Sequence, residues 1–446
     1  MSQAATVQPP AEARVSHRTW LATFITNGGV LLIGIGSGVL TARLLLPEGR
    51  GQLASILFWP AFFQGMGLLG LKEAITRRIS SGAAEIHVVA STGTWLALGY
   101  ALMSSVIGYF LLPVLLAGSH EDLVAPARQY MLILLPFAFV TLSLRSADQG
   151  RLNFAWHNTL VVAVPAVYLA ALCGLWLAGR FTVENVVWAN LGGVVVVTIL
   201  RLGLGWRWVF RLPCAAEARR LFATGLRFYL TAMVMLLGSQ ADRMVLVTFW
   251  NNASIGLYSV AATVASTGIG ALSNSFQTIV FPQMGRLCEE RARHEYLSRQ
   301  LRYATILLAG LAAAVICLTP WALPVVFGSG FKDAVYPAMA LTLALVPFAL
   351  RQILIAALRG LGEARSATVS EVIALGVFGL LIWPLAGVFG LTGLPLALLV
   401  ANAVSVAYLF RYMNTRLLLR TADWWGLNLA TARHLVRSGR RYLAGR

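Results

Sequence analysis

The amino-acid sequence predicts an all-α polytopic membrane protein, with about twelve transmembrane helices in two six-helix bundles around a central cavity. Charged residues make up 12% of the chain and hydrophobic residues 58%, whereas soluble domains carry roughly 25% charged residues. Apolar runs of about 20 residues recur from Trp20 to Arg420, and each is long enough to cross a hydrocarbon core of about 30 Å as a helix. This composition excludes a soluble globular protein.

Charged or turn-rich breaks separate the apolar runs and set the expected spans. In chain order these are residues 20–42, 53–71, 87–117, 128–145, 157–178, 183–204, 228–250, 256–281, 303–327, 335–358, 367–389 and 391–413. We therefore expect two six-helix bundles, at residues 19–204 and 228–413, joined by a basic linker at residues 205–227. A disordered cytoplasmic tail should precede them at residues 1–18, and a basic amphipathic cytoplasmic tail should follow at residues 414–446.

Basic residues are distributed unevenly between alternate loops. Most of the 35 Lys and Arg residues fall on the side that holds both termini, and the other side has only Arg43, Arg50, Arg128, Arg180 and Lys332. Because cytoplasmic loops carry an excess of positive charge, both termini are expected in the cytoplasm. The net charge of +18 is then explained by anionic membrane lipids, and no nucleic-acid partner is expected.

An internal repeat relates the two sets of spans. Residues 122–138, DLVAPARQYMLILLPFA, are identical to residues 333–349, DAVYPAMALTLALVPFA, at nine of seventeen positions. A weaker echo pairs GQLAS at Gly51 with GLYSV at Gly256. Because each unit has an even number of spans, the two bundles should be related by an axis along the membrane normal.

Three prolines inside the expected spans are hinge candidates. Pro136 and Pro347 occupy equivalent positions of the repeat, and Pro384 follows a tryptophan in the eleventh span. A proline frees a backbone carbonyl and bends a helix, which is tolerated where the break faces protein or a water-filled cavity. A local packing kink is the alternative interpretation.

Charged residues within spans are the most informative signal, because intramembrane charge is costly. Asp242 and Arg243 lie together in the seventh span. Neighbouring residues on a helix point about 100° apart, so at least one of the two should reach another helix or the cavity. They predict either a structural interhelical ion pair or a role in substrate or proton handling.

Other charged residues lie at or near span ends. Arg351 falls four residues after Pro347 in the tenth span, Arg43 closes the first span, and Lys72 and Glu73 open the first cytoplasmic loop. A terminal arginine or lysine commonly reaches the lipid headgroups, an explanation that fits Arg351 least well. Lys72 and Glu73, with Asp242, are candidates for coupling or ion pairing.

Arginine side chains facing a common cavity would suit an anionic lipid-linked cargo. A diphosphate group needs compensating donors to cross hydrocarbon, and the planar fork of arginine matches it. Neutral side chains in the spans can donate to and accept from sugar hydroxyls, or they can bridge helices instead. The cavity candidates are Arg43, Arg243, Arg351, Gln64, Asn274 and Gln277.

Four short segments of the chain are TARLLLPEGRGQLA, DRMVLVTFWNNASIGLYSVA, FPQMGRL and ALRGLGEAR. They resemble segments of the polysaccharide-transport flippases, a family that includes the O-antigen flippases. That family belongs to the multidrug, oligosaccharidyl-lipid and polysaccharide (MOP) exporter superfamily. Asp242–Arg243 matches a recurring acidic–basic pair of the family, and Arg43, Glu48 and Gly49 match its loop after the first span.

This resemblance implies a flippase of the bacterial inner membrane. Its expected cargo is an undecaprenyl-diphosphate-linked repeat unit for O-antigen, capsule or exopolysaccharide, moved to the periplasmic leaflet by alternating access. Expected partners are membrane lipids, this polyprenyl-diphosphate-linked glycan, and a polymerase or other glycan-assembly proteins.

Two other classes remain as alternatives. A multidrug or cation antiporter would share the fold but usually needs an acidic residue in its first bundle, and spans 1 to 6 have none near their centres. A polysaccharide polymerase or ligase would be an enzyme, yet no nucleophile–base pairing or metal-spaced His/Asp/Glu cluster occurs. We therefore expect a transporter, with no catalytic residue, metal or cofactor.

Overall fold

The computed structural model describes residues 17–82, 84–116, 120–151, 153–204, 209, 211–287 and 289–417. Most of both expected tails therefore lies outside the described residues. The described part of the chain is almost entirely helical and contains no strand. Its elements are α1 (His17–Gly67), α2 (Leu71–Ser80), α3 (Ile86–Leu115), η1 (Glu121–Leu123), α4 (Val124–Gly150), α5 (Phe154–Leu177), α6 (Val183–Gly203), α8 (Ala215–Phe249), α9 (Asn252–Arg286), α10 (Glu290–Phe327), η2 (Ser329–Ala334), α11 (Val335–Gly360), α12 (Ala364–Phe389), η3 (Gly390–Thr392) and α13 (Gly393–Leu417).

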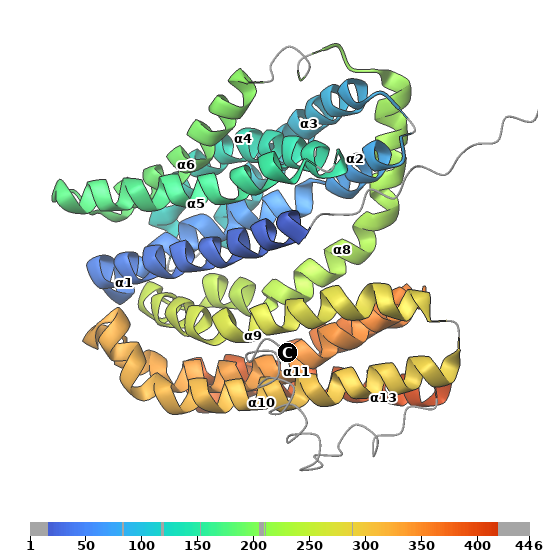
Figure 1. Cartoon of the computed structure of the whole chain (residues 1–446). Coiled ribbons are helices and arrows are strands. Elements are labelled where there is room, and N and C mark those ends of the chain that lie inside the picture. Colours follow the sequence, from blue (N-terminus) through green and yellow to red (C-terminus); the bar gives the residue numbers. More distant parts are fainter. Residues whose placement is uncertain are drawn as a thin grey trace, which may run out of the picture.

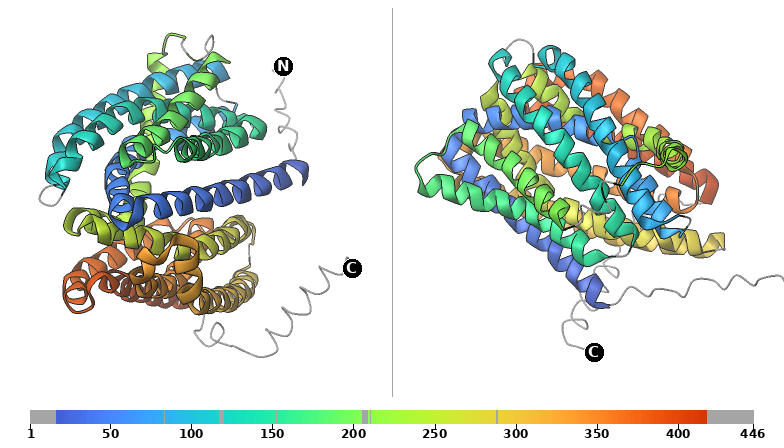
Figure 2. Two further views of the ribbon diagram at one scale, coloured as in Figure 1. Left: turned by 90° about the vertical axis from the view of Figure 1, so that its left-hand side faces the viewer. Right: turned by 90° about the horizontal axis from the view of Figure 1, so that it is seen from above.

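The helices form two layers, which confirms the expected pair of bundles. Helices α1 to α6 make the first half and α9 to α13 most of the second half, while α8 passes from one to the other (Figure 1). A view turned by 90° shows the same two layers, with the long first part of α1 lying at their boundary (Figure 2). The described residues contain ten helical stretches that are long and apolar enough to span a membrane.

Two of these ten stretches hold two expected spans each. One is Gly28–Gly67 within α1, and the other is Arg365–Thr415, which covers most of α12 and α13. The ten stretches therefore correspond to all twelve expected spans, with differences at the span ends. The second span ends earlier than expected, because a separate helix, α2, follows Gly67 after a short turn. The chain is thus a multi-pass membrane protein.

The break inside α1 has a local cause at Leu46 and Pro47. Leu46 has φ 58° and ψ 176°, which is not helical, and its side chain is exposed. The ring of a proline disfavours the helical conformation for the residue before it, and proline itself suits the first turn of a new helix. The chain consequently reverses at Leu46, and the second part of α1 runs back along the first half (Figure 1).

The two halves meet closely near this reversal. A Cβ on Gly51 would lie 1.7 Å from the carbonyl oxygen of Asn252, and one on Gly256 would lie 1.9 Å from that of Pro47. Only glycine permits such backbone contact. We call the end of the molecule that holds α2 and the start of α8 the basic end. The end near the reversal of α1, which also holds η2 and the α8–α9 turn, we call the opposite end.

Residues 215–227, expected within the linker, are the first turns of α8. Helix α8 continues without a proline to Phe249, and the side chain of Asn251 caps the next helix by accepting a hydrogen bond from the backbone N–H of Ser254. Figure 1 shows α8 beginning beside α2 and α3 and curving towards α9. One continuous helix therefore joins the two halves.

Candidate functional site

A cavity of about 390 Å³ lies between the two halves. We call it the central cavity. Its walls come from the second part of α1 and from α8 and α9, and most of the lining side chains are apolar. Arg50 and Arg243 are the charged residues among those that line it, and no carboxylate is found there within the described part of the chain. The cavity is therefore cationic and otherwise largely apolar.

Arg50 projects into this cavity from the first half. It lies in the first turn after the break at Leu46, so the reversal of α1 points it back towards the bundle. One Nη donates to the hydroxyl of Thr41 at 2.9 Å, and the buried Nε makes no hydrogen bond to any described residue. Because an unpaired buried donor is costly, this guanidinium has capacity for an acceptor from a ligand.

Arg243 reaches the same cavity from α8 in the second half. Its Nη1 donates a long hydrogen bond of 3.4 Å to the side-chain oxygen of Gln240. Phe58 and Phe62 line the facing wall, with ring centroids 6.3 Å apart in a stacked arrangement. The two halves thus contribute one guanidinium each, and the first half adds an aromatic surface.

A second, inner cavity of about 190 Å³ lies within the second half. It shares Arg243 with the central cavity, and Asp242, Arg351 and Asn402 also line it. The carboxylate of Asp242 accepts a hydrogen bond of 2.7 Å from the hydroxyl of Tyr258, which is fully buried. Asp242 therefore reaches another helix, as expected for at least one of these two neighbouring residues.

Arg351 is paired with a carboxylate inside the second half. Its Nη1 lies 3.0 Å from Oε2 of Glu371 on α12, and both side chains are almost completely buried. The contact is an ion pair without an aligned hydrogen bond. Glu371 also accepts a hydrogen bond of 3.3 Å from the side-chain amide of Gln352. Breaking such a pair leaves a buried charge uncompensated, so Arg351 is anchored by Glu371.

The structure places the other cavity candidates elsewhere. Arg43 donates to the carbonyl oxygens of Val325 and Val326, at 2.8 Å for the latter, and so ties α1 to the end of α10. Gln277 donates to Ser273 at 3.1 Å and to Asn274 at 3.4 Å along α9. None of these residues, nor Gln64, lines either of the two cavities.

The coupling and hinge candidates outside the cavities also have definite positions. Lys72 and Glu73, expected in a loop, are exposed residues of the amphipathic helix α2. Pro136, Pro347 and Pro384 lie inside α4, α11 and α12, which remain helical across them. Their role as hinges stays a prediction.

Two residues of the site were missed by reasoning from the sequence. The sequence predicts Arg50 in an external loop, because the span after it is expected to begin at residue 53. Glu371 lies four residues after the expected start of the eleventh span at residue 367, so the rule on intramembrane charge would have identified it. The signal for Arg50 was Pro47, which is typical of a helix start.

Comparison with known proteins identifies a family and a shared fold. The model of a family described as "Polysaccharide biosynthesis protein" matches residues 40–336. A search of curated protein sequences gave no match. The chain is similar to the lipid II flippase MurJ in an inward closed conformation, with a TM-score of 0.74, 16% identity, and coverage of 96% of this chain and 93% of that one.

Two further solved structures share this fold. An inward-facing multidrug resistance MATE family transporter of the MOP superfamily has a TM-score of 0.69 and 17% identity, with 90% of this chain and 98% of that one covered. A MOP superfamily transporter from Pyrococcus furiosus, described as having a binding pocket of reverse polarity, has a TM-score of 0.62 and 17% identity, with 91% and 95% covered. At identities of 16–17%, these similarities establish a shared fold alone.

Proposed function

Because the chain belongs to the polysaccharide biosynthesis protein family, we propose that it is a flippase for polyprenyl-diphosphate-linked oligosaccharide. In this proposal the cargo is an undecaprenyl-diphosphate repeat unit for O-antigen, capsule or exopolysaccharide. It moves by alternating access from the cytoplasmic to the periplasmic leaflet of a bacterial inner membrane. The basic end then faces the cytoplasm, in agreement with the distribution of positive charge between loops.

The observation that carries this proposal is the pair of arginines on the central cavity. Arg50 and Arg243 come from different halves and line one cavity that holds no carboxylate among its described residues. A diphosphate offers several acceptor oxygens, and guanidinium groups bind such oxygens in charge-assisted pairs. An anion held by both arginines would offset their mutual repulsion and link the two halves through the cargo.

The rest of the cavity wall suits the remainder of this cargo. Aromatic rings such as Phe58 and Phe62 present apolar faces beside the arginines. A volume of about 390 Å³ is at the small end of the range of about 300–1,000 Å³ that holds a drug-sized ligand. It accommodates a headgroup rather than a whole glycan, so transport requires the two halves to separate.

The same features weigh against the alternative functions. A carrier of cationic drugs would have to place its cargo beside two guanidinium groups, which is electrostatically unfavourable. The described residues form no metal-ligand cluster, and the buried carboxylates of Asp242 and Glu371 are engaged with Tyr258 and Arg351. We therefore favour transport over a polymerase or ligase activity.

The proposal is tested in cells that lack the gene for this protein. Loss of surface polysaccharide, with accumulation of lipid-linked single repeat units on the cytoplasmic leaflet, is the expected result. Repeat units that reach the periplasm without polymerising would assign the protein to polymerisation or ligation instead. Unchanged glycan with altered drug sensitivity would favour the antiporter.

A further inference from the structure

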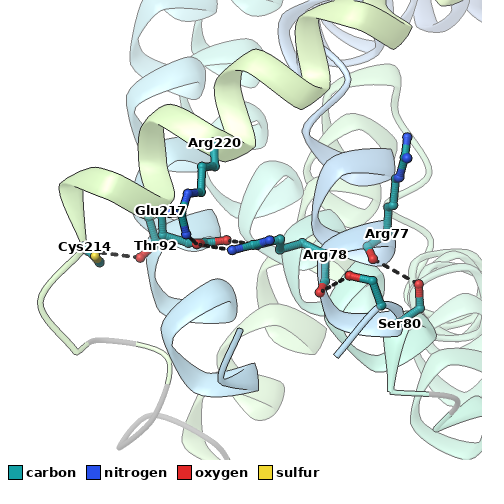
Figure 3. Close-up of polar contacts among 8 residues, drawn as sticks. Arg77, Arg78, Ser80, Thr92, Cys214, Glu217 and Arg220 are labelled. Carbon is teal, nitrogen blue, oxygen red and sulfur yellow. Dashed lines mark hydrogen bonds and ion pairs between the residues drawn. The ribbon is translucent and has the colours of Figure 1, made fainter. Parts of the chain in front are cut away.

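The first turns of α8 are attached to the first half of the molecule, although α8 continues into the second half. Figure 3 shows the contacts, which join α2 and α3 to residues 214–220. Glu217 accepts hydrogen bonds from Nε of Arg78 at 2.7 Å and from Nη2 of the same residue at 3.1 Å. Such a two-pronged pair fixes both direction and distance.

A further contact holds the same segment to the first half. Thr92 of α3, which is completely buried, accepts a hydrogen bond of 3.1 Å from the backbone N–H of Cys214 and so caps the start of α8. The side chain of Glu217 is only 4% exposed, and Arg220 also approaches it, at 3.7 Å. We call residues 215–225 the foot of α8.

The foot ends at a backbone contact between two glycines. A Cβ on Gly225 would lie 2.7 Å from the carbonyl oxygen of Leu69, and one on Gly70 would lie 2.3 Å from that of Gly225. Gly70 also has φ 72°, a conformation that side chains disfavour. The foot therefore packs against the turn before α2 with no room for a side chain between them.

The later part of α8 belongs equally clearly to the second half. Gly238, Ser239 and Ala241 line the inner cavity together with residues of α11, α12 and α13. Asp242 is held by Tyr258 of α9. Helix α8 thus crosses between the halves within the thirteen residues that follow Gly225, which at 1.5 Å per residue is about 20 Å.

We propose that the foot moves as a rigid part of the first half, and that relative movement of the halves bends α8 between Gly225 and Gly238. The division between the two moving bodies then lies inside a helix and not in the loop before it. These two residues are the only glycines of α8, which has no proline. Glycine is a common site of helix bending where proline is absent.

The test measures distances between spin labels and does not depend on the cargo. Cysteines 173, 214, 288 and 317 are first replaced by serine. One pair of labels, at Lys72 and Arg219, reports the distance from α2 to the foot, and a second, at Arg219 and Glu290, reports the distance from the foot to α10. All three positions are exposed. Both pairs are measured by double electron–electron resonance in reconstituted protein.

Gly51→Val supplies the movement, because its side chain would overlap Asn252 and force the halves apart at the opposite end. We expect the Arg219–Glu290 distance to shift in this variant and the Lys72–Arg219 distance to stay unchanged. Gly256→Val, which acts from the other half, should repeat the result if the first variant folds poorly. A shift of the Lys72–Arg219 distance, or a fixed Arg219–Glu290 distance in both variants, overturns the proposal.

Discussion

Arg50 and Arg243 differ in how each guanidinium is held. Arg50 is oriented by Thr41 and keeps a buried Nε without an acceptor, whereas Arg243 has one long contact to Gln240. In the proposed transport, Arg50 is therefore positioned before cargo arrives, and Arg243 has more freedom to adjust. Both properties suit two halves that close around one anion.

Replacing either arginine by alanine should lower transport without lowering the amount of folded protein. A hydrogen bond to a charged group contributes about 1.5–3 kcal/mol, so we expect a loss of roughly tenfold to hundredfold in initial rate. Arg128→Ala is the matched control, because Arg128 donates to the carbonyl of Tyr109 and does not line either cavity. Equal rates for the three variants would remove both arginines from the cargo site.

The buried pair of Arg351 and Glu371 predicts an effect on stability. Glu371→Gln leaves Arg351 as a buried charge without a counter-ion, and breaking such a pair costs about 3–5 kcal/mol. We expect a lower melting temperature in detergent. The double variant Arg351→Met with Glu371→Leu should recover much of the loss, since an apolar pair needs no counter-ion. A single variant as stable as the unmodified protein contradicts a structural role for the pair.

At the residue scale, charge within a span was informative, but partners could not be assigned. The sequence identified Asp242, Arg243 and Arg351 as unusual, and the structure lines the inner cavity with all three. The sequence could not show that Tyr258 contacts Asp242 or that Glu371 contacts Arg351, because those contacts join different helices. Arg43 was expected to line a cavity, but its partners are backbone carbonyl oxygens, which have no signature in the sequence.

The contact between α2 and the foot of α8 is tested at the scale of the element by charge reversal. Arg78→Glu places two carboxylates together and should detach the foot, with loss of transport. Adding Glu217→Arg restores a pair of opposite charge and should recover most of the activity. Arg77→Glu is a matched control that changes charge on the same helix without touching this pair. A double variant as inactive as Arg78→Glu alone would contradict a direct interaction.

The same contact should be insensitive to moderate changes of pH. The hydrogen bond to Glu217 raises the pKa of Arg78 above its ordinary value. A basic group whose pKa is raised by folding stabilises the folded state fully at pH values below its unfolded pKa. This stabilisation is lost only as the pH rises through the pKa that the group has in the folded state. We therefore expect the Lys72–Arg219 distance to remain constant from pH 7 upward to the alkaline limit of the reconstituted protein. Lengthening on mild alkalinisation would contradict this.

Helix positions were predictable where apolar runs are long and uniform, and less so at their ends. Helix α2 was missed because its ten residues include several charges and only one apolar face, buried through Leu71, Ala74, Ile75 and Ile79. The length of α8 was underestimated for a related reason, since the polar foot reads as a linker. Hydropathy identifies contact with lipid, whereas both segments are helical through contact with protein.

At the scale of the whole molecule, the sequence repeat has a geometric counterpart. Gly51 and Gly256, paired by the weaker echo in the sequence, lie against each other, with the N atom of Gly51 3.1 Å from a Cβ placed on Gly256. Equivalent points of two related bodies can touch only close to the axis that relates them. An axis relating the halves, as the repeat predicts, would therefore pass near this contact at the opposite end.

Flipping of the cargo between leaflets is measured with purified protein in vesicles. Fluorescent polyprenyl-diphosphate oligosaccharide is incorporated, and its transfer between leaflets is followed by quenching from outside. We predict transfer by the unmodified protein, transfer at the background rate with Arg50→Ala and Arg243→Ala combined, and full transfer with Arg128→Ala. Transfer that is equal with and without the two cavity arginines, or that is absent from the unmodified protein, would contradict a flippase whose cargo binds in the central cavity.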